Sequence, residues 1–152
     1  MKSGRRLLLM AAGLLTVCSC SLAWIDQIMP ANIKLGTLIT STVTTLFGNA
    51  VIINVDLLDH INLLMTLFVI GVIIMAAAAT GSKAVAAIGL ILAMLAIVMN
   101  LIASGLGLFN IFTNFANLGL GMQLAMLACL LILFVLLLPK IKKLFNRAKP
   151  TA

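Results

Sequence analysis

The sequence predicts an all-α integral membrane protein in which an N-terminal signal or anchor is followed by three transmembrane helices. Its composition argues against a water-soluble fold: 64% of the 152 residues are hydrophobic and 9% are charged, against about 45–50% and about 25% in soluble domains. Three uncharged apolar runs, residues 61–80, 84–104 and 118–138, are each close to the roughly 20 residues that a membrane-spanning helix needs. We therefore expect a three-span membrane domain over residues 61–138.

The charged residues alternate between two groups along the chain. All three acids, Asp26, Asp56 and Asp59, lie with Lys34 between an N-terminal apolar run, residues 7–17, and the run at residues 61–80. If every run crosses a bilayer once, the acids share one side, and the other nine bases share the opposite side. Basic loops stay in the cytoplasm, so residues 24–60 are expected to be extracytoplasmic and the C-terminus cytoplasmic. The nine bases are Lys2, Arg5, Arg6, Lys83, Lys140, Lys142, Lys143, Arg147 and Lys149.

Residues 1–23 have the layout of a secretory signal. A basic start precedes an apolar core over residues 7–17, and small residues occupy the two positions that signal peptidase inspects. Three fates are open at this point: cleavage after Ala23, acylation of Cys20 as in a lipoprotein, or retention as an uncleaved anchor. Each fate leaves Trp24 on the outer face, where an interfacial aromatic residue is expected.

Residues 24–60 form an extracytoplasmic amphipathic segment. Between residues 35 and 50, apolar residues recur every three or four positions, which is typical of one helical face. Frequent β-branched residues leave a hairpin as the alternative. The other face is uncharged and rich in hydroxyl groups. In an oligomeric channel or transporter, that face would line a polar path formed by Thr37, Thr40, Ser41, Thr44 and Thr45.

Short connections determine how the spans are arranged. The turn residues of 80–83 place the first two spans side by side as an antiparallel hairpin over residues 61–104. We expect the third span to end at Pro139, because proline lacks an N–H and has a fixed φ. Residues 139–152 then form a basic cytoplasmic tail that binds anionic lipid, at about 1 kcal/mol per basic residue near the surface.

Residues 105–117 connect the second and third spans. Their composition predicts a short amphipathic helix on the outer surface, or an outward extension of the third span. Phenylalanines on one side would seat this segment among the lipid headgroups. Its polar positions, available to a partner or polar substrate, are Asn110, Thr113, Asn114 and Asn117.

The second span carries a seven-residue repeat of small side chains. Such a repeat predicts a tight helix interface, because helices in lipid associate through close backbone approach and van der Waals contact. We expect Asn100 to pair with a polar group on the neighbouring helix, which belongs either to this chain or to another copy. The seam consists of Ser82, Ala86, Gly89, Ala93, Ala96, Asn100, Ala103 and Gly107.

Asp56, Asp59 and His60 form one cluster of titratable groups before the first span. Two carboxylates beside an imidazole are able to bind a divalent metal ion or to relay protons. The alternative interpretation is structural: Asp59 caps the following helix, and Asp56 and His60 pair at positions i and i+4.

Other functional classes lack a pattern in this sequence. The cysteines Cys18, Cys20 and Cys129 make neither a zinc nor a redox motif, and no phosphate-binding loop or nucleophile elbow occurs. No basic stripe interleaved with aromatic residues indicates nucleic-acid binding. We therefore expect no enzyme activity, no cofactor and no nucleic-acid partner.

The leading hypothesis is a small non-enzymatic subunit that packs into a larger membrane assembly through the Ser82–Gly107 seam. The alternatives are an oligomeric channel or transporter subunit, and an assembly or immunity factor that binds one membrane partner. The signal-like start and the charge sorting indicate the bacterial cytoplasmic (inner) membrane. The layout of a signal, an Ala/Gly-rich hairpin and a very short cytoplasmic turn is similar in outline to small inner-membrane subunits of conjugation and type IV secretion machines, pilins included, although a pilin normally has two spans. Expected partners are the bilayer and other membrane proteins or copies of this chain.

Overall fold

The computed structural model describes residues 3–25, 28–48, 56–105 and 118–147. Apart from one isolated antiparallel bridge between Lys34 and Asn62, the regular structure in these ranges is helical. The helices are α1 (Ser3–Ser19), the 3-10 helix η1 (Pro30–Asn32), α2 (Leu35–Phe47), the 3-10 helix η2 (Asp56–His60), α3 (Leu63–Thr80), α4 (Lys83–Ala103) and α6 (Leu120–Arg147).

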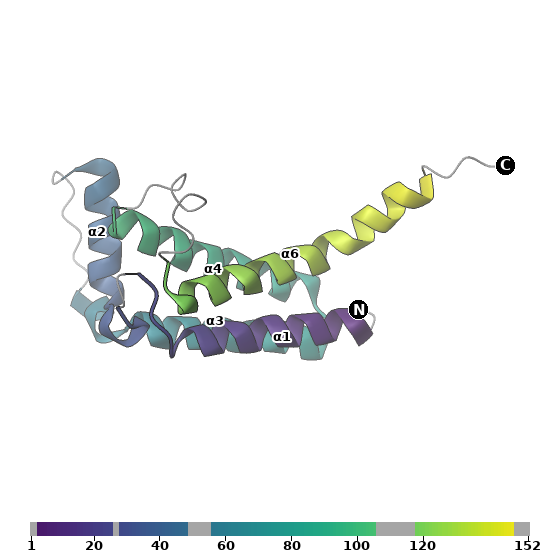
Figure 1. Ribbon diagram of the computed structural model, residues 1–152, viewed down its shortest axis with the longest axis horizontal. Helices are drawn as coiled ribbons and strands as arrows, with labels where there is room; N and C mark the ends of the chain where they lie inside the picture. The colour runs from purple at the N-terminus through teal and green to yellow at the C-terminus, as the bar shows by residue number, and fades with distance from the viewer. Residues whose placement is uncertain (1–2, 26–27, 49–55, 106–117, 148–152) are drawn as a thin grey trace.

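Of the five α-helices in the described residues, α1, α3, α4 and α6 form an up-and-down bundle, and α2 lies across its end. Contacts join α1 to α3, α3 to α4, α4 to α6 and α6 back to α1, and each neighbouring pair runs antiparallel (Figure 1). The beginning of α1, the turn between α3 and α4, and the end of α6 therefore lie at one end of the bundle. Helix α2 runs across the opposite end.

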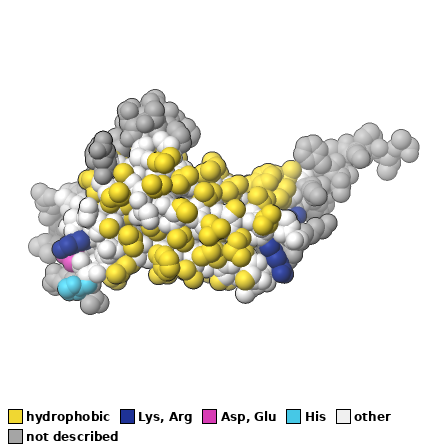
Figure 2. Space-filling model, turned by 60° about the horizontal axis from the view of Figure 1, so that its bottom comes forward, with side chains coloured by type: hydrophobic (Ala, Val, Ile, Leu, Met, Phe, Trp, Pro, Cys, Tyr) yellow, Lys and Arg dark blue, Asp and Glu magenta, His cyan; other side chains and the backbone are white. Residues whose placement is uncertain are grey.

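Three helices are long and apolar enough to cross a membrane: α3, α4 and residues Leu120–Pro139 of α6. This confirms the predicted all-helical class and its three apolar helices. On the face shown in Figure 2, hydrophobic side chains form a broad belt, and the described charged side chains lie at its two ends. Only two residues separate α3 from α4, so the two helices run antiparallel. Gly81 is the C-cap of α3, with φ 71°, and the side chain of Ser82 accepts a hydrogen bond from the N–H of Val85 at the start of α4.

Helix α1 is a full member of the bundle. Leu9 and Ala12 have no exposed surface, and Thr16 and Ser19 are also buried. The two hydroxyl groups donate to carbonyl groups of the same helix, Thr16 to Ala12 and Ser19 to Thr16, so their burial leaves no polar group unsatisfied. The N-terminal segment, which the sequence presented as a signal or an anchor, thus contributes one side of the core.

Glycine allows α1 and α3 to approach closely. A Cβ atom on Gly13 would lie 3.0 Å from the carbonyl oxygen of Gly71, and a Cβ on Gly71 would lie 3.1 Å from the carbonyl oxygen of Gly13. The two glycines thus face each other across the interface. Met75 and Val17 cover them from either side, at 2.5 Å and 2.6 Å from the same Cβ positions.

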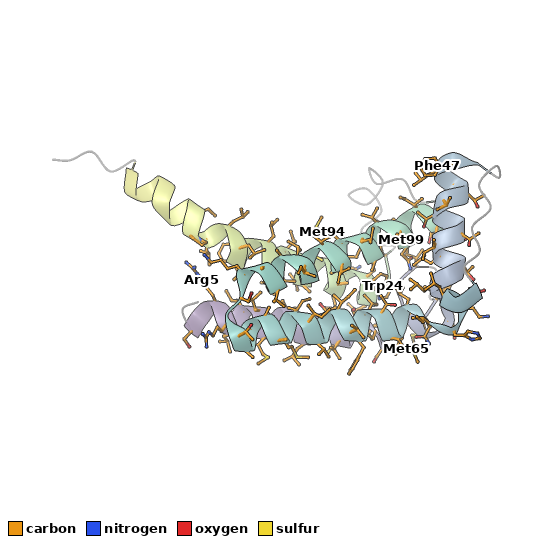
Figure 3. The ribbon with its side chains drawn as sticks, turned by 180° about the vertical axis from the view of Figure 1, so that it is seen from behind. Arg5, Trp24, Phe47, Met65, Met94 and Met99 are labelled. Atoms are coloured by element: carbon orange, nitrogen blue, oxygen red, sulfur yellow. The ribbon has the colours of Figure 1, made fainter. Side chains whose placement is uncertain are left out.

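The chain after α1 closes the bundle against the start of α6. Trp24 is fully buried, and its indole N–H donates to the carbonyl of Ser19 at 3.1 Å. The backbone N–H groups of Gly119 and Gly121 donate to the carbonyls of Trp24 and Ala23. A Cβ on Gly119 would collide with these same carbonyls. The indole is therefore a core side chain (Figure 3) and not a surface one, and the level of Trp24 relative to a membrane stays a prediction.

Two further expectations need correction or lie outside the described residues. The candidate span does end at Pro139, but the expected helix break there is wrong, because Pro139 lies inside α6, which continues to Arg147. Proline removes one helical hydrogen bond, but residues beyond it can continue the helix. The predicted connector helix with Asn110, Thr113, Asn114 and Asn117 lies outside the described residues.

The helix prediction for residues 35–50 is confirmed over Leu35–Phe47, and the hairpin alternative is wrong.

We predict that Gly71→Leu destabilises the bundle by about 1–3 kcal/mol, because the new side chain must displace Val17 and the backbone of α1. Thermal unfolding of the purified protein in detergent measures the effect. Gly4→Leu is the matched control, since a Cβ there meets nothing within 4 Å. Equal melting temperatures for the two variants would contradict the close α1–α3 contact.

Candidate functional site

The end of the bundle that carries α2 is the candidate functional site. Helix α2 is held there by a short two-stranded contact that joins its start to the start of α3. The N–H of Leu35 donates to the carbonyl of Ile61 at 2.7 Å, and the N–H of Leu63 donates to the carbonyl of Ile33 at 2.8 Å. Lys34, the N-cap of α2, is therefore fixed at the level where α3 begins.

A second contact joins the middle of α2 to α4. Leu38 and Thr42 are the buried residues on this side of α2. The hydroxyl of Thr42 donates to its own helix at Leu38, at 2.7 Å, and lies 3.2 Å from the carbonyl of Met99 in α4. These contacts hold α2 across the bundle end. The exposed residues of this helix are Thr37, Thr40, Thr45, Leu46 and Phe47.

An apolar cavity of about 580 Å³ lies on one flank of α2. Its walls come from α2, α3 and α4, and its one polar side chain, Thr66, donates to the carbonyl of Asn62 at 3.2 Å. Exposed apolar side chains of α3 and α4, such as Met65 and Leu95, continue from the cavity onto the side of the bundle. In a bilayer, lipid chains would fill such a surface.

The predicted polar-path residues all belong to α2, but this helix crosses the end of the bundle and does not run through it (Figure 1). Thr40 and Thr45 donate their hydroxyl groups to the carbonyls of Gly36 and Ser41 in the same helix. Thr37 is exposed, and Ser41 and Thr44 are half-buried. A hydroxyl-bearing face is therefore present, at the bundle end.

The small-residue seam of α4 is buried inside the chain itself. Ala86, Gly89, Ala93, Ala96 and Asn100 are all buried. A Cβ on Gly89 would lie 2.7 Å from Ile74, so this glycine meets α3 directly. The partner helices are α3, α6 and α2 of the same chain.

The remaining seam residues lie toward the two ends of the repeat. Ser82 caps α4 and Ala103 is half-buried, whereas Gly107 lies outside the described residues. Asn100 does not make its expected interhelical hydrogen bond: the side chain is 3% exposed, and its Nδ2 has no partner in the part of the chain that the structure describes.

Asp59 does not have the α3-capping role that the sequence predicted. Asn62 is the N-cap of α3, and its side chain accepts from the N–H of Met65 at 3.0 Å. Asp59 lies in η2, half-buried, and its Oδ1 has no hydrogen-bond partner among the described residues. His60 is exposed, and the side chain of Asp56 lies outside what the structure describes. Among the side chains that the structure describes, which do not include Asp56, no group of three or more potential metal ligands is found, and the metal or proton hypothesis for the cluster stays a prediction.

Sequence reasoning overlooked Asn62, although it fits the usual signal of an Asn directly before an apolar helix. The acids nearby drew attention to Asp59 instead. In the sequence, Lys34 was only the one base that grouped with the acids, whereas in the structure this residue is the N-cap of α2.

Comparison with protein-family models, with curated protein sequences and with solved structures finds no match to this chain.

We predict that Asn62→Ala lowers the free energy of unfolding by about 1 kcal/mol, because the first turn of α3 loses its cap. Asp59→Asn should leave thermal stability nearly unchanged, since the carboxylate caps no helix. Melting temperatures of both variants check this assignment. A larger loss for Asp59→Asn than for Asn62→Ala would return the capping role to the acid.

Proposed function

We propose that this protein is a small non-enzymatic subunit of the bacterial inner membrane, and that it contributes a preformed four-helix unit to a larger membrane assembly. The observation that carries the proposal is the exposed apolar tip of α2, formed by Leu46 and Phe47. The small-residue seam of α4 does not make this contact, contrary to the hypothesis drawn from the sequence. Since α3, α6 and α2 of the same chain cover these small residues, the unit completes its own core. Its surface is then free to meet lipid along the sides and a protein partner at the end.

The charge distribution supports an orientation for this unit. Arg5, Arg6 and Lys83 lie at or next to the bundle end opposite α2, while Lys34, Asp59 and His60 lie at the end that carries α2. Basic segments stay in the cytoplasm. The proposal therefore places α2 on the extracytoplasmic side, with the α3–α4 turn and the end of α6 in the cytoplasm.

The packing of α1 supports its retention as a fourth transmembrane helix. The support comes from packing and not from length, because α1 includes Arg5 and Arg6 near its start and its apolar part is shorter than the stretch of about 17–25 residues that crosses a bilayer. Cleavage after Ala23 would remove the partners of Gly71 and the carbonyl that accepts from Gly121. It would also expose a core face of α3 and α6 to lipid without its matching surface.

We predict that the mature protein contains residues 1–23. Intact mass spectrometry of protein purified from the membrane should give the mass of the full chain. A variant in which a strongly cleaved signal replaces residues 1–23 should still reach the membrane but unfold at a lower temperature. A mature chain that begins at Trp24, or one that begins at a lipid-modified Cys20, would contradict retention.

The tip of α2 is the proposed contact with the assembly. Leu46 and Phe47 are 57% and 68% exposed, and they lie at the end of α2 away from its contacts with the bundle. Phe47 projects from this end, which is opposite the end that carries Arg5 (Figure 3). Exposed aromatic and aliphatic side chains on an extramembrane element are typical anchors of protein interfaces.

We predict that Phe47→Ala releases this protein from its assembly without impairing membrane insertion. Phe68→Ala is the matched control, because Phe68 is 52% exposed within the apolar span α3, where it is expected to face lipid. Native gels of detergent-solubilised membranes measure the size of the complex for each variant. A complex that survives Phe47→Ala but dissociates with Phe68→Ala would move the contact to the side of the bundle. A protein that migrates as a single chain in every variant would contradict assembly membership.

A further inference from the structure

A second cavity, of about 360 Å³, lies where the start of α2 meets the end of α4. Most of its lining surface is apolar, but unlike the cavity beside α3 it also has several polar side chains in its wall. Its apolar wall includes Ile28 and Ile33 from the segment before α2. The polar residues that line it are Asn32, Lys34, Thr37, Ser41, Asn100 and Ser104.

The most informative side chain in this cavity is Asn100. It is 3% exposed, yet its Nδ2 has no hydrogen-bond partner within the described chain. A buried amide group that lacks a partner is costly unless a ligand or an ordered water supplies an acceptor. Asn100 both lines the cavity and lacks that acceptor, so the chain provides a donor here that its own fold does not use.

Other donors around the cavity are also uncommitted. The side chains of Asn32, Lys34, Thr37 and Ser41 make no hydrogen bond or ion pair with the rest of the described chain. By contrast, the α2 hydroxyl groups of Thr40, Thr42 and Thr45 all donate to carbonyls one turn earlier. Of the α2 hydroxyl groups without such a bond in the described chain, those of Thr37 and Ser41 line the cavity next to the Lys34 ammonium group, and that of Thr44 does not.

The charge of the cavity selects an anionic ligand. Among the residues that the structure describes, Lys34 is the one charged residue in the lining, and no carboxylate is found there. A phosphodiester would find an ammonium group, hydroxyl groups and an amide donor. A zwitterionic headgroup would bring a second, cationic part for which the lining offers no anion.

The position of the cavity identifies the source of that phosphodiester. Ala103 and Ser104 stand at the end of the α4 span, and the bridge from Lys34 to Asn62 holds the lysine at the start of the α3 span. The cavity is thus level with the ends of two candidate spans, where a bilayer has its phosphate groups. Ile28 and Ile33 offer apolar surface to the glycerol and upper acyl chain.

We propose that this cavity binds the headgroup of an anionic phospholipid of the outer leaflet. The phosphodiester pairs with Lys34 and accepts hydrogen bonds from Thr37, Ser41 and Asn100. This inference rests on the membrane placement proposed above. It is distinct from the anionic lipid expected at the basic C-terminal tail, which lies at the opposite end of the bundle.

Native mass spectrometry of the delipidated full chain, titrated with phosphatidylglycerol or phosphatidylcholine in detergent, tests the proposal. We expect one phosphatidylglycerol to be retained per chain in preference to phosphatidylcholine. Lys34→Gln should weaken this retention about fivefold, the loss expected for one basic group near a phosphate. Lys83→Gln is the matched control, at the cytoplasmic end, and should retain the lipid.

A second variant and a topology assay separate the ways in which the proposal could fail. Thr37→Val combined with Ser41→Ala removes two exposed or half-buried hydroxyl groups without altering the core, and it should also weaken retention. Equal binding of the two lipids, or binding unchanged by both the Lys34 and the hydroxyl variants, would overturn the site. A reporter fused after Ala152 that is active only in the exported compartment would instead overturn the membrane orientation, and with it the assignment to the outer leaflet.

Discussion

The structure depends on close backbone contact between helices. Lipid solvates apolar side chains nearly as well as a protein interior does, so helices in a membrane gain stability chiefly through van der Waals contact at short range. Gly13 against Gly71 provides this contact between α1 and α3, and Gly89 against Ile74 provides it between α3 and α4. At the mouth of the bundle, Gly119 and Gly121 bring the start of α6 onto the carbonyls of residues 22–24. Two of these three contacts require the N-terminal segment.

This packing also determines where other molecules can bind. The side chains that would have suited an intermolecular seam in α4 are buried within the chain, and the outer sides of α3, α4 and α6 carry the apolar residues that suit lipid. Polar groups without intramolecular partners gather around the start of α2, and an apolar tip lies at its other end. Both proposed recognition surfaces are therefore at one end of the molecule, on a helix that is held in place by short contacts to α3 and α4.

Local patterns predicted the elements that depend on local physics. Length and hydropathy were sufficient for α3, α4 and the apolar part of α6, because a span needs only enough uncharged residues in sequence. The three- and four-residue spacing predicted α2, and the turn residues predicted the break at Gly81. The same local rules failed at Pro139, where a proline inside a long helix was taken for its end. They failed again at Asp59, where a nearby Asn proved to be the cap.

The sequence by itself determined the number of long apolar helices, the turn that pairs two of them and the sorting of charge along the chain. These properties follow from composition and from neighbours within a few residues. Only the tertiary structure decided that the signal-like segment packs into the core, that Trp24 is buried and that Asn100 faces a cavity without an acceptor. Each of those outcomes depends on which helices meet, because burial and hydrogen-bond satisfaction are properties of the assembled bundle and not of any one segment.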